Sequence, residues 1–357
     1  MEGLGFVLQQ DANLQTLTED VLKTSEIEGE ALDHSQVRSS LARRLGIDIG
    51  GLRPADRHVE GIVEMILDAT RNYAAPLTAE RLFGWQAALF PTGYSSLYPI
   101  RTGAWRQDVT GPMQVVSGAV GREHVHFEAP PAQRIDAEVT AFLDWFNAGL
   151  DIDPVLQAGL AHLWFVTLHP FEDGNGRIAR AIGDMALARS ELTGQRFYSL
   201  SAQIREERND YYEILERTQK GTLDVTAWME WILGCFGRAL ARSEAAVASV
   251  LTKSRLWTAI ATVPLNERQR AVLARVIDGG DGGNKWEGKL TTSKWAKLAN
   301  CSQDTAHRDI ISLVNQGILI RNPEGGRSTS YSIQPHGAAH SGSLRTGENQ
   351  ETGNPES

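Results

Sequence analysis

Apolar residues recur every three or four positions through most of the segment 16–256, a spacing that gathers them on one face of an α-helix. Between the helical segments, apolar and polar residues alternate in two short runs, 113–118 and 123–127, separated by glycine, which predicts a β-hairpin. The fold class expected for this part is mainly α with one short hairpin. The spacing predicts helices over 54–73, 78–89, 133–148, 154–168, 175–191, 200–219 and 224–257.

Residues 264–335 follow a different pattern. Helices are expected over 266–278, 293–299 and 302–317, and two strand-like runs follow at 318–321 and 329–333. Three helices followed by a hairpin resemble a small α+β winged helix-turn-helix domain, in which Ser302 would cap the third helix. The resemblance implies candidate DNA contacts at Gln303, Thr305, His307, Arg308, Arg321 and Arg327.

The distribution of charge has the sign that DNA binding needs, but the difference is small. Residues 264–335 hold ten Lys or Arg against seven Asp or Glu, net +3, whereas residues 1–263 hold 24 against 34, net −10. Winged helices also serve as dimerisation or protein-binding modules, so both interpretations stay open. Residues 336–357 are polar and nearly free of apolar side chains, and we expect them to be a disordered tail.

Composition bounds the class of protein. The 357 residues exceed a typical single domain, so two or more units are expected. The most continuous apolar stretch, 228–236, is far shorter than the ~20 residues of a membrane-spanning helix. The first residues show no secretory leader, and the only cysteines, Cys235 and Cys301, predict no disulfide framework. We therefore expect a cytoplasmic protein without a membrane span, provided that the N-terminus is complete.

The densest chemistry lies in residues 169–180, which read HPFEDGNGRIAR. Gly174 and Gly176 allow a tight turn whose N–H groups point into one concavity at the start of a helix, and such a corner attracts anions. Arg177 and Arg180 lie about one turn apart on that helix, so both guanidiniums can reach the same polyanion. The segment therefore predicts a phosphate-binding site.

Two further side chains in the same segment add chemistry. Asp173 offers the hard oxygen that a Mg²⁺ ion shared with a diphosphate requires, and His169 titrates near neutrality and can accept a hydroxyl proton. Each residue alone is explained by an ordinary structural role, as part of a loop, as a solvated charge on a helix or as a helix cap. The combination in twelve residues favours a site.

This segment matches the signature H-x-F-x-[DE]-G-N-G-R-x-x-R of the Fic family, so the chain resembles enzymes that move AMP from ATP onto a protein hydroxyl. The resemblance implies a Fic-type helical bundle. By position it makes His169 the proton acceptor, Asp173 the Mg²⁺ ligand and Phe171 a buried anchor. It assigns the phosphates of the nucleotide to Gly174, Asn175, Gly176, Arg177 and Arg180.

A second motif lies far upstream. Thr24, Glu28 and Gly29 fit the pattern [ST]-x-x-x-E-[GN], which resembles the inhibitory motif of many Fic proteins. The resemblance implies that Glu28 pairs with Arg180 and displaces the γ-phosphate, within one chain or across a dimer. The same carboxylate could orient a water molecule and remove AMP from a modified protein. The alternative is an ordinary solvated acidic helix.

The predicted hairpin resembles the flap that presents the target side chain in Fic proteins, which makes Val116, Ser117 and Gly118 candidate target contacts. His124 and His126 alternate on its second strand. Because no third ligand is near them in the sequence, we interpret both as polar surface residues.

Three residues after the motif are candidates for the nucleoside pocket. The resemblance places Tyr211, Tyr212 and Gln219 in its lining, and packing of the tyrosines in the core is the alternative.

Together these patterns predict an autoinhibited protein adenylyltransferase that uses ATP and Mg²⁺ and modifies a Tyr, Thr or Ser hydroxyl of a protein, with the chain itself among the candidate targets. A nucleotide-sensing transcriptional regulator and a Glu28-dependent hydrolase are the alternatives, and a homodimer is a candidate state. The expected domains are N-terminal helices over 1–50 with the inhibitory helix at about 17–30, a catalytic domain over 51–257, the winged helix over 264–335 and the tail over 336–357.

Overall fold

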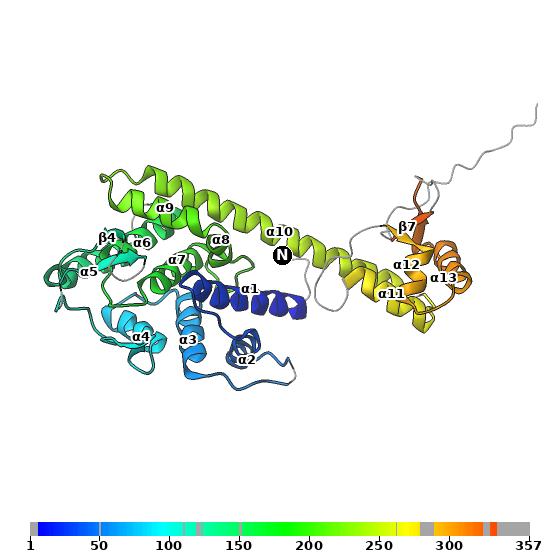
Figure 1. The fold of residues 1–357 in the computed structure, drawn as a ribbon, viewed down its shortest axis with the longest axis horizontal. Helices are drawn as coiled ribbons and strands as arrows, with labels where there is room; N and C mark the ends of the chain where they lie inside the picture. Colours follow the sequence, from blue (N-terminus) through cyan, green and yellow to red (C-terminus); the bar gives the residue numbers. More distant parts are fainter. Residues whose placement is uncertain are drawn as a thin grey trace, which may run out of the picture. The chain divides into compact units, whose positions relative to one another are not determined.

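The computed structural model divides into two compact units, Met1–Ala245 and Ala246–Ser357, each described by itself (Figure 1). The expected N-terminal helices over 1–50 thus fall in the same unit as residues 51–245, and the boundary lies within the catalytic domain expected over 51–257. Arg327 and the expected tail over 336–357 lie outside the described residues. The structure describes residues 6–49, 51–109, 111–118, 122, 124–149, 152–261, 263–278, 289–323 and 329–333.

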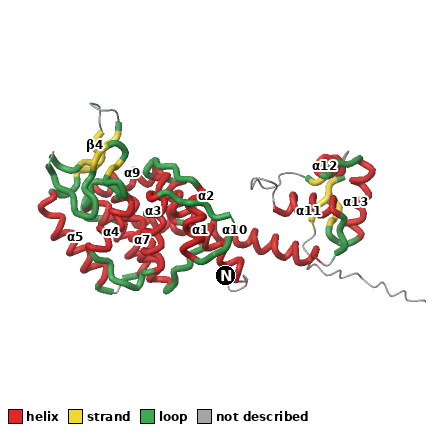
Figure 2. Tube along the Cα trace, turned by 90° about the horizontal axis from the view of Figure 1, so that it is seen from below, coloured by secondary structure: helices red, strands yellow, loops and turns green. Residues whose placement is uncertain are grey.

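The first unit is built from helices, and Figure 2 shows the strands of one hairpin at the edge of this helical body. The fold class is confirmed as mainly α. Its helices are α1 (Phe6–Ile27), α2 (His34–Leu45), α3 (Arg57–Arg71), α4 (Ala79–Leu89), α5 (Ala132–Asn147), α6 (Pro154–Leu168), α7 (Asn175–Glu191), α8 (Leu200–Glu206), α9 (Arg208–Gln219) and α10 (Thr226–Ala261), which continues into the second unit.

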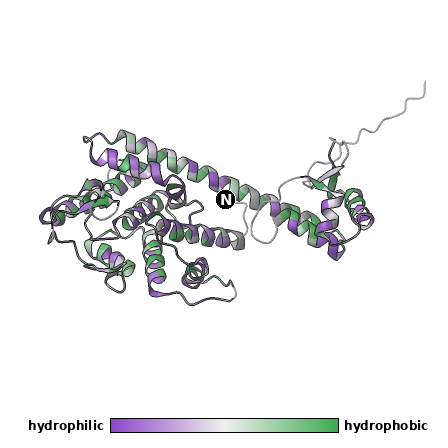
Figure 3. Ribbon diagram, viewed as in Figure 1, coloured by the Kyte–Doolittle hydropathy of each residue, from purple (hydrophilic) through white to green (hydrophobic). Residues whose placement is uncertain are grey.

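Helix α7 lies at the centre of this unit and packs against α6, α3, α4 and α1. Nearly every residue of α7 from Asn175 to Ala188 is buried, so the helix that follows the glycine turn is a core element rather than a surface one. The surrounding helices are amphipathic, with green and purple positions mixed along each ribbon in Figure 3. The core therefore fixes the start of α7 in place.

Capping residues set several helix starts. Asp33 accepts a hydrogen bond from the N–H of Gln36 at 2.9 Å, and Asp153 accepts one from Val155 at 2.8 Å. Pro154 occupies the first helical position of α6, where its missing N–H costs nothing. These caps set the starts of α2 and of α6, and α6 has the bounds predicted from the sequence.

Two small hairpins interrupt the helices. Strands β3 (Gln114–Ser117) and β4 (His124–Glu128) pair antiparallel and confirm the predicted hairpin. Strands β1 (Tyr94–Ser95) and β2 (Tyr98–Pro99) form a second one that the sequence pattern did not predict, because two-residue strands carry no alternation. A second difference is the predicted helix over 200–219, which breaks at Glu207 into α8 and α9.

The second unit has its own apolar core, which includes Leu273, Trp295, Ile310 and Leu313. Ser302 caps α13 as expected, since its hydroxyl accepts the N–H of Thr305 at 3.2 Å. The observed order matches the expected one apart from the additional strand β5, and the sheet order is β5-β7-β6. The elements after α10 are α11 (Glu267–Asp278), β5 (Leu290–Thr291), α12 (Thr292–Leu298), α13 (Gln303–Asn315), β6 (Leu319–Arg321) and β7 (Ser330–Ile333).

Candidate functional site

Burial of Phe171 and hydrogen bonds of the Asn175 side chain fix the loop between α6 and α7. His169 ends α6 in the left-handed conformation, with φ 48°, and Phe171 is fully buried against Trp105, whose ring centroid lies 5.0 Å away. The side chain of Asn175 accepts the N–H of Phe171 at 3.0 Å and donates to its carbonyl at 2.8 Å. Asn175 therefore closes the loop with its side chain, and only its backbone N–H is left for a ligand.

We expect Asn175→Ala to lower the free energy of unfolding by about 1–3 kcal/mol, because two buried backbone groups of Phe171 lose their partner. Urea denaturation of the purified protein measures this change. The matched control is Asn209→Ala, at an exposed position of α9, which should change the stability by less than about 0.5 kcal/mol. Equal losses in the two variants would contradict the role of Asn175 in the loop.

The start of α7 is suited to an anion. Gly174 precedes the helix with φ 91° and supplies no capping side chain, so the first N–H groups of α7 have no partner within the helix. In this structure the carboxylate of Glu28 lies against that turn: a Cβ atom added at Gly176 would come within 2.3 Å of Glu28 Oε1. The glycine at 176 thus leaves room for an anionic group over the helix start.

Both arginines of the motif are buried and bound by the last turn of α1 and the residues that follow it. Arg180 Nη2 donates to Glu28 Oε1 at 2.7 Å and to the carbonyl of Thr24 at 2.9 Å, and its Nε donates to the Thr24 hydroxyl at 2.7 Å. Arg177 Nη1 donates to Glu30 Oε2 at 2.8 Å. The two motifs, 152 residues apart between Arg180 and Glu28, therefore meet in space.

Each guanidinium keeps one nitrogen without a partner. Arg180 Nη1 and Arg177 Nε are buried and make no hydrogen bond within the described part of the chain. Burial disfavours the charged form of Arg180, but Glu28 and two nearby tyrosines together raise the pKa of this guanidinium above its ordinary value. A buried cation with an unfilled donor is the arrangement expected where an additional anion binds.

His169 is held neutral with a defined tautomer. Its Nδ1 lies 3.3 Å from the carbonyl oxygen of Val166, which only accepts, so Nδ1 carries the proton and Nε2 keeps its lone pair. Burial is the main cause that lowers the pKa of this imidazole to about 4, and Arg106 adds to the shift. His169 is therefore unprotonated near neutral pH and able to accept a proton.

Asp173 lies at the rim of a pocket of 340 Å³ that also touches Glu28, Glu30 and Arg177. Its Oδ1 accepts the N–H of Gly174 at 2.5 Å, and its Oδ2 accepts the hydroxyl of Ser95. With 41% of the side chain exposed, the carboxylate keeps lone pairs that face solvent. The pocket thus combines a hard oxygen ligand with the guanidinium of Arg177 at the start of α7.

The three residues predicted to line the nucleoside pocket lie in different surroundings. Tyr211 is buried in the core, and its hydroxyl oxygen lies 3.0 Å from His162 Nε2. This agrees with the alternative that the tyrosine packs in the core. Tyr212 is partly exposed, and its hydroxyl donates to the carbonyl of Ile27, the residue before Glu28, at 3.3 Å. Gln219 donates to the Thr167 hydroxyl at 3.2 Å, near the end of α6.

Of the remaining predicted residues that the structure describes, all but Thr305 are exposed. Val116 and Ser117 are exposed on β3, and Gly118 follows in the left-handed conformation with φ 106°. On α13 Thr305 is half-buried and bonds back to Ser302, while the exposed candidates of the second unit are Gln303, His307, Arg308 and Arg321.

Three residues at the site were not predicted from the sequence. Glu30 holds Arg177, Ser95 holds Asp173, and Arg106 donates through Nε to the carbonyl of His169 at 2.8 Å. Glu30 directly follows Gly29, the last residue of the upstream motif, and this position is the signal that could have found it. Ser95 lies on the two-residue strand β1 and Arg106 in a loop, neither has a local pattern, and only the fold brings them to the motif.

Two stretches of this helical unit match known protein-family models. Residues 76–187 match the Fic/DOC family, and the chain therefore carries a Fic/DOC-family domain. Residues 1–47, which include Thr24 and Glu28, match a domain of unknown function (DUF4172). In the described residues we find no helix long and apolar enough to cross a membrane.

Two curated relatives carry the name Protein adenylyltransferase Fic. The chain is 31% identical to that of Nematostella vectensis over 116 residues, 31% of this chain and 25% of that protein. It is 26% identical to that of Drosophila willistoni over 225 residues, 60% of this chain and 39% of that protein. The matches thus span well under half of these relatives.

Among solved structures, the crystal structure of a Fic family protein from Desulfovibrio desulfuricans G20 resembles this chain with a TM-score of 0.51 at 20% identity. The likeness covers 94% of this chain and 90% of that one, and it shows a similar fold.

Proposed function

We propose that this chain is an autoinhibited protein adenylyltransferase that transfers AMP from ATP to the hydroxyl of a Tyr, Thr or Ser side chain of a protein. The observation that carries the proposal is the pairing of a neutral imidazole at His169 with an uncapped helix start flanked by two buried arginines with unfilled donors. The Fic/DOC match and the names of two partial relatives support the same reaction class.

The proposed reaction uses these groups in fixed roles. The target hydroxyl oxygen attacks the α-phosphorus of ATP, the bond from that phosphorus to the oxygen bridging to the β-phosphate breaks, and pyrophosphate leaves. The hydroxyl proton moves to Nε2 of His169. The N–H groups at the start of α7, with Arg177 and Arg180, bind the negative charge of the phosphates.

The residues present fit a Mg²⁺ ion. A partly exposed carboxylate at the rim of the pocket is the single protein ligand that Mg²⁺ commonly takes when it also binds substrate phosphates, and Asp173 would hold it. When bound, the ion would neutralise phosphate charge, while the groups of the chain bind the nucleotide and accept the proton.

The autoinhibition that we propose follows from competition between anions. Glu28 occupies Arg180, and Glu30 occupies Arg177, so both cations are already paired when the nucleotide arrives. A triphosphate would have to displace these carboxylates to be held in full. Glu28 is the stronger candidate for the inhibitor because it also lies over the start of α7.

The test is transfer of label from ATP carrying a radioactive α-phosphate, in the presence of Mg²⁺. We expect Glu28→Gly to raise self-labelling or labelling of a cell extract about 5–150-fold, the range of a coupling of 1–3 kcal/mol. The matched control is Glu26→Gly, because Glu26 pairs with Lys23 and Arg205 and touches neither arginine of the motif. No labelling by wild type or Glu28→Gly would contradict the proposal.

A regulator acting through the second unit is the second candidate, favoured by the exposed Gln303, His307 and Arg308 on one helix. Binding to DNA of the promoter region of its own gene, measured by gel shift without any labelling activity, would support it. The hydrolase alternative predicts that labelled protein loses AMP only while Glu28 is present.

A further inference from the structure

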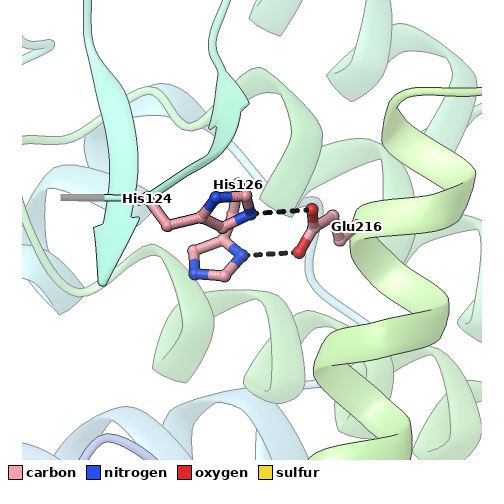
Figure 4. Close-up of side chains that lie close together, drawn as sticks. All are labelled: His124, His126 and Glu216. Atoms are coloured by element: carbon pink, nitrogen blue, oxygen red, sulfur yellow. Dashed lines mark hydrogen bonds and ion pairs between the residues drawn. The ribbon is translucent and has the colours of Figure 1, made fainter. Parts of the chain in front are cut away.

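Two histidines of the hairpin and a glutamate of α9 gather outside the site described above (Figure 4). His124 and His126 lie on β4, and Glu216 is half-buried on α9. Their ligand-type atoms all lie within 4.8 Å of one another. No third ligand lies near the histidines in the sequence, since Glu216 is 90 positions from His126, but the fold places one beside them.

An irregularity in the hairpin directs both imidazoles to the same carboxylate. Val116 pairs with Val125 and Val115 with Phe127, so His126 is the extra residue of a β-bulge. His126 Nδ1 lies 2.5 Å from Glu216 Oε2, and Ser117 Oγ lies 2.6 Å from the other nitrogen of the same ring. A bulge that aims one side chain at a distant helix is a specific arrangement rather than a random surface contact.

We propose that His124 Nε2, His126 Nδ1 and the carboxylate of Glu216 bind a divalent transition-metal ion, with Zn²⁺ as the best match. Two imidazoles and one carboxylate form a donor set that suits Zn²⁺ and leaves a fourth position for water, whereas Mg²⁺ and Ca²⁺ prefer oxygen ligands throughout. The ion takes the place of the proton between His126 and Glu216, and these two atoms move apart to roughly 3.3 Å around it.

The exposure of the cluster allows this rearrangement. The side chain of His124 is 66% exposed, and its Nε2 lies 3.6 Å from Glu216 Oε1, so a small rotation brings it to the ion. A glutamate carboxylate is ionised at neutral pH, as a metal ligand must be.

Lys220 would compete with the metal ion for the carboxylate of Glu216. Its Nζ lies 2.6 Å from Glu216 Oε1 and 3.3 Å from the carbonyl oxygen of Val125 on β4. The ion must move this ammonium group away, since the two positive charges share one carboxylate. The bound ion would then fasten β4 to α9 in place of the lysine, and under the proposed function this would fix the hairpin expected to present the target.

The test is metal binding by the full chain, purified without an affinity tag and treated with a chelator. Co²⁺ absorption bands and competition of Zn²⁺ with a chromogenic chelator measure the affinity. We expect His126→Ala and Glu216→Gln to weaken binding at least ~10-fold and Lys220→Met to strengthen it. His34→Ala is the control, because His34 is exposed on α2, and it should bind like wild type.

Hydrogen exchange gives a second measurement that does not depend on enzymatic activity. Zn²⁺ should slow the exchange of backbone amides in β3 and β4 of wild type but not of His126→Ala. The proposal is overturned if neither wild type nor Lys220→Met shows saturable binding. It is also overturned if His126→Ala and Glu216→Gln bind the metal as tightly as wild type. Neither assay uses ATP, so failure here leaves the proposed transferase untouched, and the reverse also holds.

Discussion

Replacing His169 with alanine in the Glu28→Gly background is expected to lower the rate of AMP transfer by roughly 10²–10⁴-fold, the usual contribution of a positioned general base. The affinity for ATP should stay the same, because the phosphates are assigned to the helix start and the arginines rather than to the imidazole. Labelling rates and calorimetric titration with ATP measure the two quantities separately. His34→Ala in the same background is the control and should leave both unchanged.

The pH profile tests the same residue without a substitution at position 169. A general base works only when unprotonated, so the rate falls as the pH falls through the pKa of His169. With this pKa lowered to about 4 by burial, the Glu28→Gly variant should keep a constant rate from about pH 5.5 to 8. A rate that halves near pH 6.5, the ordinary value of histidine, would contradict the buried environment described for His169.

The chemistry of the motif could be predicted from the sequence because it is local. His169, Asp173 and the arginines lie on one turn and the helix after it, so their spacing alone determines that they share a corner. The contact of Arg180 with Thr24 and Glu28 is different. It joins residues about 150 positions apart, and only the resemblance of the upstream motif pointed to it.

Contacts made by the fold without a motif could not be predicted. Ser95 reaches Asp173 from a two-residue strand, and Glu216 reaches the histidines from α9, and neither has a local pattern that marks it. The same holds for the break between α8 and α9. Glu207 ends α8 with ψ 28° and is bound by Arg238 at 2.5 Å, whereas the sequence there contains no glycine or proline.

A buried charge cluster links α1 to α7. Arg196 Nη1 lies 2.7 Å from Asp184 Oδ1, and both side chains are almost fully buried. Asp20 on α1 is fully buried beside them and accepts the hydroxyl of Ser199. Burial and then the charge of Asp184 raise the pKa of Asp20 to about 8, so one cation and one ionised carboxylate remain at neutral pH.

Asp184→Asn is expected to lower the free energy of unfolding by about 3–5 kcal/mol, because it breaks the 2.7 Å ion pair of the buried Arg196 and leaves only Asp20, which burial holds neutral, to ionise in its place. Chemical denaturation at pH 7 measures the loss. Asp20→Asn is the matched control, since it makes the same change on the other carboxylate of the cluster. It should be tolerated or stabilising, because Asp20 is already neutral in the folded protein.

The pH dependence of the stability also distinguishes Asp20 from Asp184. The folded pKa of Asp20, about 8, lies above its ordinary value of 3.8, so its contribution to stability is complete below about pH 4 and is lost as the pH rises through 8. An asparagine at position 20 does not titrate. The Tm of Asp20→Asn should therefore exceed that of wild type by more at pH 8 than at pH 5. A constant gap, or a loss of stability in Asp20→Asn as large as that in Asp184→Asn, would show that Asp20 is ionised in the folded protein.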